Sequence, residues 1–91
     1  MGAKGEIGWK RLDDDGVRVK ICAEPNRRDW RFYYQYRRND RWEELEDPTL
    51  EDWQNLLDSV RRRIARRLLT PDAEKNVKRL IREHHPDAEL G

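Results

Sequence analysis

Basic side chains share the middle of this chain with aromatic ones, and their spacing gives them a common direction. In two segments the basic residues recur at alternate positions, and a tyrosine falls into the same alternation. Guanidinium and ammonium groups neutralise phosphates, and a tyrosine between them can stack on a nucleic-acid base. The same cations can also bind an acidic helix or tail of another protein. The candidate binding residues are Lys10, Arg18, Lys20, Arg31, Tyr33 and Arg37.

The same residues also fit a sheet face that only meets water. One face of an antiparallel sheet is normally solvated, and the aliphatic stems of Lys and Arg cover it. Three interpretations therefore stay open from these residues alone: a solvated face, a protein-binding face and a nucleic-acid-binding face.

These residues need a sheet to align them, and the segment 30–37 predicts its central strand. Trp30, Phe32, Tyr34 and Tyr36 alternate there with other side chains. Alternation of bulky rings with period two is typical of a strand with one buried face. We expect the even residues to be core and the odd residues to face water or a partner.

Two earlier strands are predicted, one around Trp9 and one over residues 17–23. A three-residue loop at 14–16, with Gly16 in the left-handed conformation, joins them and sets Trp9 opposite Ile21. This register keeps the apolar residues of both strands on one side of the sheet.

The next two connections decide the rest of the sheet. A four-residue loop over 26–29 sets Ala23 opposite Phe32, so that aromatic and small apolar residues meet across the strands. A short fourth strand starts at Trp42. A three-residue loop places Trp42 beside Tyr36 under the helices, whereas a two- or four-residue loop places it on the open face beside Arg37; we favour the buried position.

After residue 45 the apolar period lengthens to that of a helix. Thr49 is the predicted N-cap, with Asp52 as its partner in a capping box. A second helix begins at Thr70-Pro71, because Pro is tolerated in a first helical turn, and it stops at Pro86. The apolar stripe of the first helix is Leu50, Trp53, Leu56, Leu57, Val60, Ile64 and Leu68.

These elements predict an α+β fold. We expect an antiparallel β-meander of three strands plus a short fourth, with two C-terminal helices packed on one face as a two-layer sandwich. The chain of 91 residues is long enough for one domain, spanning 1–91, with disordered tails at 1–5 and 87–91.

The charge is balanced overall but segregated along the chain. There are 20 basic and 19 acidic residues, for a net charge of +1 and a pI of about 7.9, below the value typical of a dedicated nucleic-acid binder. All charged residues from Glu43 to Asp58 are acidic, and an arginine cluster follows. We expect this cluster to complement the helix dipole, with Arg67 finding a partner. The cluster is Arg61, Arg62, Arg63, Arg66 and Arg67.

The residues that could do catalysis or hold a metal are poorly arranged for it. Cys22 has no His or second Cys placed by sequence to activate it. His84 and His85 are adjacent, so on a helix they diverge by about 100° and cannot share a metal ion. His84 is expected at the core margin and His85 as a cation at the helix end. We therefore predict no enzyme, no cofactor and no metal site.

One cysteine fits a reducing compartment, and no apolar run is long enough to span a membrane. The sequence thus predicts a cytoplasmic, non-enzymatic module that binds an acidic surface of another protein. The alternative is a nucleic-acid-binding domain that uses the basic open face of its sheet.

Overall fold

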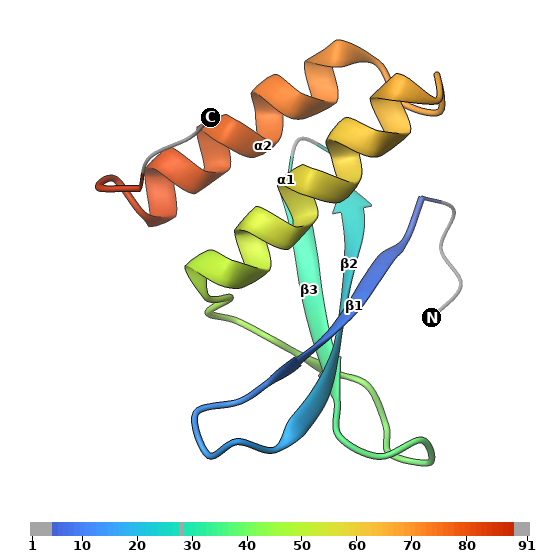
Figure 1. Cartoon of the computed structure of the whole chain (residues 1–91), viewed down its shortest axis with the longest axis vertical. Coiled ribbons are helices and arrows are strands. Elements are labelled where there is room, and N and C mark those ends of the chain that lie inside the picture. Colours follow the sequence, from blue (N-terminus) through green and yellow to red (C-terminus); the bar gives the residue numbers. More distant parts are fainter. Residues whose placement is uncertain (1–4, 28, 89–91) are drawn as a thin grey trace. The chain divides into compact units, whose positions relative to one another are not determined.

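The computed structural model describes residues 5–27 and 29–88, and the chain divides into two compact units. Residues 1–47 form the sheet unit and residues 48–91 the helical unit, which are described separately (Figure 1). Four antiparallel strands are followed by two helices that pack together, so the predicted α+β class is confirmed.

The sheet is a meander in which each strand pairs with the next. Its order is β1-β2-β3-β4, and all three pairings are antiparallel. The strands are β1 (Ile7–Leu12), β2 (Arg18–Asn26), β3 (Asp29–Gln35) and β4 (Glu43–Glu44). The fourth strand is as short as the sequence predicts.

The β1–β2 hairpin has the predicted three-residue loop. Gly16 has a φ of +80°, in the left-handed region, and its N–H donates to the Asp13 carbonyl at 3.0 Å. The Asp13 N–H donates to the Val17 carbonyl at 2.8 Å, which closes the ladder. Trp9 therefore lies opposite Ile21, as expected.

The β2–β3 pairing also has the predicted register, with Ala23 opposite Phe32. The strands run further than predicted, because Asn26 pairs with Asp29 and only residues 27 and 28 connect them. Arg27 makes this tight turn with a φ of +59°. The predicted loop was thus too long by one residue on each side, which leaves the register unchanged.

The buried face of the sheet is smaller than predicted. Phe32 is 2 % exposed, and its ring meets that of Trp9 edge-on at a centroid distance of 6.0 Å. Trp9, Trp30 and Tyr34 are half-buried. The buried side chains of this face are Ile7, Val19, Ile21, Ala23 and Phe32.

Tyr36 is not core, and the prediction that it is was wrong. It is 46 % exposed, and its hydroxyl donates to Asp13 Oδ2 at 2.8 Å. Tyr34 similarly donates to Glu43 Oε2 at 2.7 Å. Both rings carry a polar tip that is satisfied by a carboxylate at the surface, and this is why alternation alone overestimated their burial.

Trp42 lies on the open face of the sheet, so the favoured prediction that it is buried beside Tyr36 was wrong. Tyr34 pairs with Glu43, so the same register carried one step back places Trp42 opposite Gln35 and on the side of the sheet away from Phe32. Residues 36–42 connect β3 to β4. The width of this connection is held by Gln35 Nε2, which donates to the carbonyls of Arg38 at 3.3 Å and Asp40 at 2.8 Å.

The first helix, α1 (Leu50–Ala65), begins with the predicted capping box. The Asp52 N–H donates to Thr49 Oγ1, and the Thr49 N–H donates to Asp52 Oδ2, both at 3.1 Å. These bonds satisfy backbone donors that the helix cannot satisfy itself. Its buried apolar residues are Trp53, Leu56, Leu57 and Val60.

α1 ends earlier than its apolar pattern predicts. The Leu68 N–H donates to the Arg63 carbonyl at 2.8 Å and the Arg67 N–H to that of Ile64 at 2.9 Å, the bonds of a Schellman motif. Arg67 adopts the left-handed conformation with a φ of +62°. Leu68 consequently leaves the stripe and is 67 % exposed, so its predicted burial was wrong.

The second helix, α2 (Pro71–His84), runs beside α1 and buries Val77, Leu80 and Ile81 (Figure 1). Pro71 occupies the first turn, as predicted. The His84 ring is exposed but stacks on that of Trp53 at 5.2 Å. His85 caps the helix through its backbone N–H.

The predicted tails fall mostly outside the described residues. Of residues 87–91 only 87 and 88 are described, and the Ala88 N–H donates to the His85 carbonyl at 3.0 Å. Within the described parts of the chain, neither helix has the length and apolar character needed to cross a membrane.

Replacement of Phe32 tests the assignment of the buried sheet face. We expect Phe32→Ala to lower the free energy of unfolding by about 3–5 kcal/mol, because it leaves a cavity where a ring was buried. Leu68→Ala, at an exposed site, should change it by less than about 0.5 kcal/mol. Urea denaturation followed by circular dichroism measures both, and equal effects would contradict the assignment.

Candidate functional site

The open face of the sheet is the side opposite Phe32, and it carries most of the candidate residues. Side chains alternate along a strand, so the even positions of β1 and β2 and the odd positions of β3 point to this side. Lys10, Lys20 and Tyr33 are on this face as predicted, and so are Arg18 and Arg31.

Two cations meet directly across the first strand pair, where Lys10 lies opposite Lys20. The backbone bond from Asp13 to Val17 sets the alternation of the ladder, and by it Lys10 and Lys20 form a non-hydrogen-bonded pair. Side chains are closest in such pairs, with Cα atoms about 4.5 Å apart. Arg18 lies two residues before Lys20 in β2 and points to the same face. The three cations Lys10, Lys20 and Arg18 make this corner of the open face positive.

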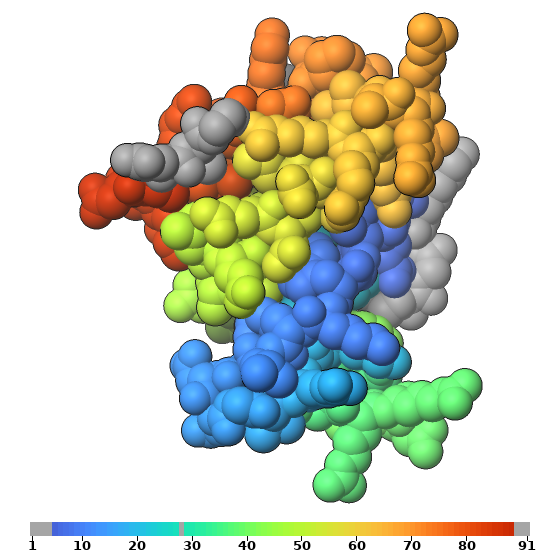
Figure 2. Space-filling view, viewed as in Figure 1, coloured from blue at the N-terminus to red at the C-terminus, as the bar shows by residue number. Residues whose placement is uncertain are grey.

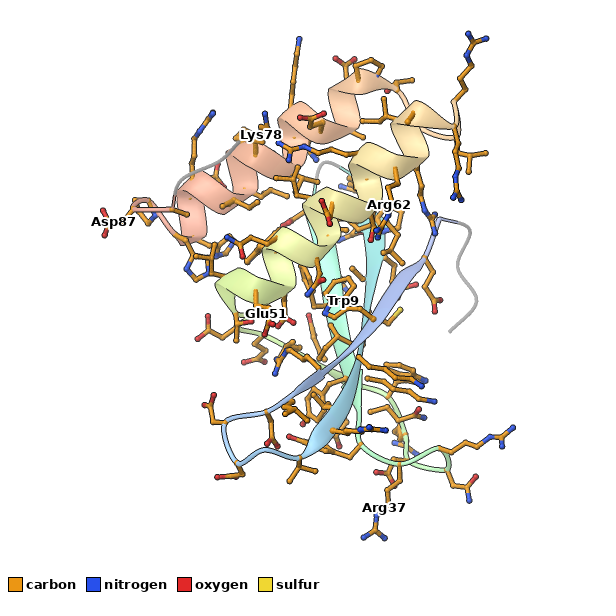
Figure 3. All side chains as sticks on the ribbon, viewed as in Figure 1. Trp9, Arg37, Glu51, Arg62, Lys78 and Asp87 are labelled. Atoms are coloured by element: carbon orange, nitrogen blue, oxygen red, sulfur yellow. The ribbon has the colours of Figure 1, made fainter. Side chains whose placement is uncertain are left out.

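The other candidates lie opposite an acidic residue or away from this corner. Arg31 lies opposite Glu24 on the same face. Tyr33 is half-buried between Cys22 and Glu44. Arg37 lies beyond β3 in the turn, and its side chain points away from the strands (Figure 3). The structure therefore brings together Lys10, Lys20 and Arg18 and separates Arg31 and Arg37 from them.

The turn that carries Arg37 is itself an exposed feature. The Arg37 N–H donates to Asp40 Oδ2 at 3.1 Å, and the Asp40 N–H donates to the Arg37 carbonyl at 2.9 Å. Long side chains of this turn, in green, stand out from the surface around them (Figure 2). Arg37 is thus held by its backbone while its guanidinium remains at the surface.

A hollow of about 340 Å³ adjoins the lysine pair. Gly8 and Cys22 face each other across the strands, and their small size leaves room that larger side chains would fill. Trp42, half-buried, brings an indole ring to the same hollow. Its side-chain lining on this face is Glu6, Lys10, Lys20, Cys22 and Trp42.

The cysteine in this hollow is inert at neutral pH. Cys22 is 1 % exposed, and burial together with a hydrogen bond to the Glu6 carboxylate raises the pKa of its thiol to about 12. The thiolate is the nucleophilic form, so such a thiol does not serve as a nucleophile. The hollow therefore offers shape, an aromatic ring, two cations and the Glu6 carboxylate rather than a reactive group.

Sequence reasoning missed Trp42 and Gly8. The side on which Trp42 emerges depends on whether the preceding loop is odd or even in length, and the sequence leaves both open. Gly8 within a strand carried a signal, because a glycine there often marks a close approach of another group. Its alternation with Glu6 and Lys10 identifies the face on which that approach would occur.

A second hollow, of about 300 Å³, lies on the opposite side of the same unit. Asp13 is among the residues that line it. Hydrogen bonds from the Val17 N–H and the Tyr36 hydroxyl lower the pKa of the Asp13 carboxyl group. The same bond to Asp13 raises the pKa of Tyr36. These polar groups satisfy one another and fix the hairpin, so we assign them a structural role.

The arginine cluster of α1 is partly tied into the helical unit. Arg61 Nε bonds Glu74 Oε2 at 3.1 Å, and Lys78 contacts the same carboxylate at 3.1 Å. Hydrogen bonds from Lys78, which has the larger effect, and from Arg61 lower the pKa of the Glu74 carboxyl group. Arg67, which was expected to find a partner, is exposed and adopts the left-handed conformation just after the end of α1. Lys78 and Arg62 are marked in Figure 3.

Metal chemistry has no visible centre in the described parts of the chain. No group of three or more His, Cys, Asp or Glu residues converges there. The acidic residues of the open face are Glu6, just before β1, Glu24 on β2 and Glu44 on β4.

Cys22 gives a test of this geometry. A thiol reagent at pH 8 should modify the folded protein far more slowly than the protein in denaturant, because the thiol is buried and its pKa is raised to about 12. Stability should fall as pH rises from the unfolded pKa of 9.0 toward 12, since only the unfolded chain then releases the proton. Rapid stoichiometric modification of the folded chain would contradict the assignment.

Comparison with known proteins gives no family model, no curated protein and no solved structure that matches the chain. Its function is therefore inferred from the chemistry of the open face.

Proposed function

We propose that this chain is a non-enzymatic protein-interaction module that binds an acidic segment of another protein on the open face of its sheet. The observation that carries the proposal is the direct pairing of Lys10 with Lys20 beside the hollow at Gly8. Like charges opposite each other on a sheet are destabilising. A carboxylate from a partner would offset that repulsion.

The hollow supports a peptide partner over a simple anion. Binding sites gain most of their energy from a few anchors that enter pockets, with charges at the rim setting orientation. Trp42 provides an aromatic wall, and Lys10 and Lys20 provide the charged rim. An acidic segment with one apolar or aromatic side chain matches both features.

The charge pattern of the face disfavours a polyanion. Glu6, Glu24 and Glu44 share this face with the cations, and Glu24 lies opposite Arg31. A nucleic-acid backbone repeats its negative charge at short intervals and would meet these carboxylates. A protein segment can place its charges only at the positive corner.

Nucleic-acid binding is the second candidate, and one observation favours it. The indole of Trp42 borders the same hollow as two lysines, an arrangement that can stack on a base while the cations neutralise phosphates. Tyr33, the aromatic residue predicted for that role, is half-buried and less available.

Binding of an acidic probe tests the proposal. A fluorescent peptide pool that alternates Glu with Leu or Phe should bind the whole chain, and Lys20→Glu should weaken binding about ten-fold, near 1.4 kcal/mol. The matched control is Lys75→Glu, the same charge change at an exposed position of α2, which should leave binding unchanged. Equal loss in both variants would indicate a general charge effect and contradict the site.

The two candidate functions separate in a salt series with a mixed-sequence oligonucleotide. A nucleic-acid binder loses affinity steeply as salt rises, because counterions are released. We expect no measurable binding to the oligonucleotide under conditions where the acidic peptides bind. Tight, steeply salt-dependent oligonucleotide binding that Lys20→Glu abolishes would overturn the protein-binding proposal.

A further inference from the structure

The outer side of β1 forms one edge of the sheet. β1 is first in the strand order and pairs with β2 on one side. Among residues 5–27 and 29–88 no strand pairs with its other side. Free edges carry N–H and C=O groups that pair readily with another strand.

The hairpin ladder shows which backbone groups point outward. The backbone bond from Asp13 to Val17 makes the odd residues of β1 the ones bonded to β2. The N–H and C=O groups of Gly8 and Lys10 therefore point to the free edge. The same alternation accounts for the bond from the Leu45 N–H to the Phe32 carbonyl at the other side of the sheet.

We propose that a second copy of this chain pairs with that edge, β1 against β1, antiparallel and centred on Gly8. In this register Gly8 faces Gly8 of the second copy, Glu6 faces Lys10 and Ile7 faces Trp9. Even residues meet even residues, as the outward direction of their backbone groups requires. The contact is isologous, so every interaction occurs twice.

Charge complementarity selects this register. Lys10 and Glu6 are both on the open face, and the pairing sets the Lys10 of each copy opposite the Glu6 of the other. Moving the centre by two residues to Lys10 would set Lys10 against itself. Moving it the other way, to Glu6, would set Glu6 against itself and leave most of β1 unpaired. Centres at Ile7 or Trp9 also match even residues with even residues, but they set Glu6 or Lys10 against Gly8 and form no pair of opposite charges between the copies.

The pairing also offsets the repulsion between like charges within each copy. Lys10 lies opposite Lys20, and Glu6 of the second copy would lie next to Lys10 in the same row of residues across the strands. The register of β1 with β2, carried one step back from the Ile7–Ala23 pair, sets Glu6 opposite Glu24. Lys10 of the second copy would extend that row. At the centre, two glycines present no side chains on either face.

The assembly doubles the four-stranded sheet. Its two-fold axis is perpendicular to the sheet, because residues that share a face in one copy meet residues of the same face in the other. The two positive corners and their hollows then lie on one continuous surface, whatever ligand each of them binds.

Reversal of the two charges provides the experiment, measured by sedimentation equilibrium of the whole chain from micromolar to millimolar concentration. We expect the wild-type chain to dimerise reversibly. Lys10→Glu alone and Glu6→Lys alone should each raise the dissociation constant about ten-fold or more, because two attractive contacts become repulsive. An equimolar mixture of the two variants should associate again, since each Glu then faces a Lys. Lys75→Glu should behave as wild type.

The outcomes decide the proposal without reference to Lys20 or Trp42. A wild-type chain that stays monomeric at millimolar concentration overturns it, as does a dimer insensitive to Lys10→Glu. Failure of the mixture to associate overturns the register. If Gly8→Pro, which removes one outward N–H and no bond to β2, leaves a dimer intact, the edge is not the interface. Circular dichroism of each variant confirms that it is folded.

Discussion

The register of the β1–β2 hairpin is the constraint on which the rest of the sheet depends. Asp13 Oδ1 accepts hydrogen bonds from the N–H groups of Asp15 and Val17, both at 2.9 Å, and Gly16 supplies the left-handed turn. A slip of one residue would turn every side chain to the other face. The burial of Ile21, the pairing of Lys10 with Lys20 and the outward backbone groups of Gly8 all follow from this one turn.

Features encoded by neighbouring residues were predictable from the sequence. The Gly16 turn, the capping box of Thr49 and Asp52, and the start of α2 at Pro71 each rest on contacts within a few positions. The cross-strand register of Ala23 with Phe32 was also predicted, although the loop was not. Lengthening both strands by one residue shortens the loop by two and keeps every pair, which is why the register survived this error.

The errors share a different physical origin, because each depended on a group that the local pattern does not reveal. The face on which Trp42 lies depends on whether the preceding loop has an odd or an even number of residues. The width of that loop is set by the Gln35 side chain, which donates to two carbonyls of the turn. Tyr36 left the core because Asp13, distant in sequence, satisfies its hydroxyl. Leu68 is not part of α1, because Arg67 adopts the left-handed conformation that glycine usually supplies at the end of a helix. The candidate site was only partly predictable for the same reason. Alternation along the strands predicted the face of Lys10 and Lys20, whereas the face of Trp42 depends on the length of the preceding turn.

The charges of the open face support the proposed binding role, because they do not add to the stability of the fold. A domain of this size is stable by roughly 5–14 kcal/mol, and a like-charged pair directly across two strands costs about 0.2–1 kcal/mol. Arg31 shows that the fold can match charges, because Glu24 faces it on the neighbouring strand. At Lys10 and Lys20 it does not, and the room left by Gly8 and Cys22 lies at the same place. A solvated face gains no stability from this combination of paired lysines with a hollow beside an indole ring, whereas the proposed acidic partner would place a carboxylate at the lysines and a side chain in the hollow.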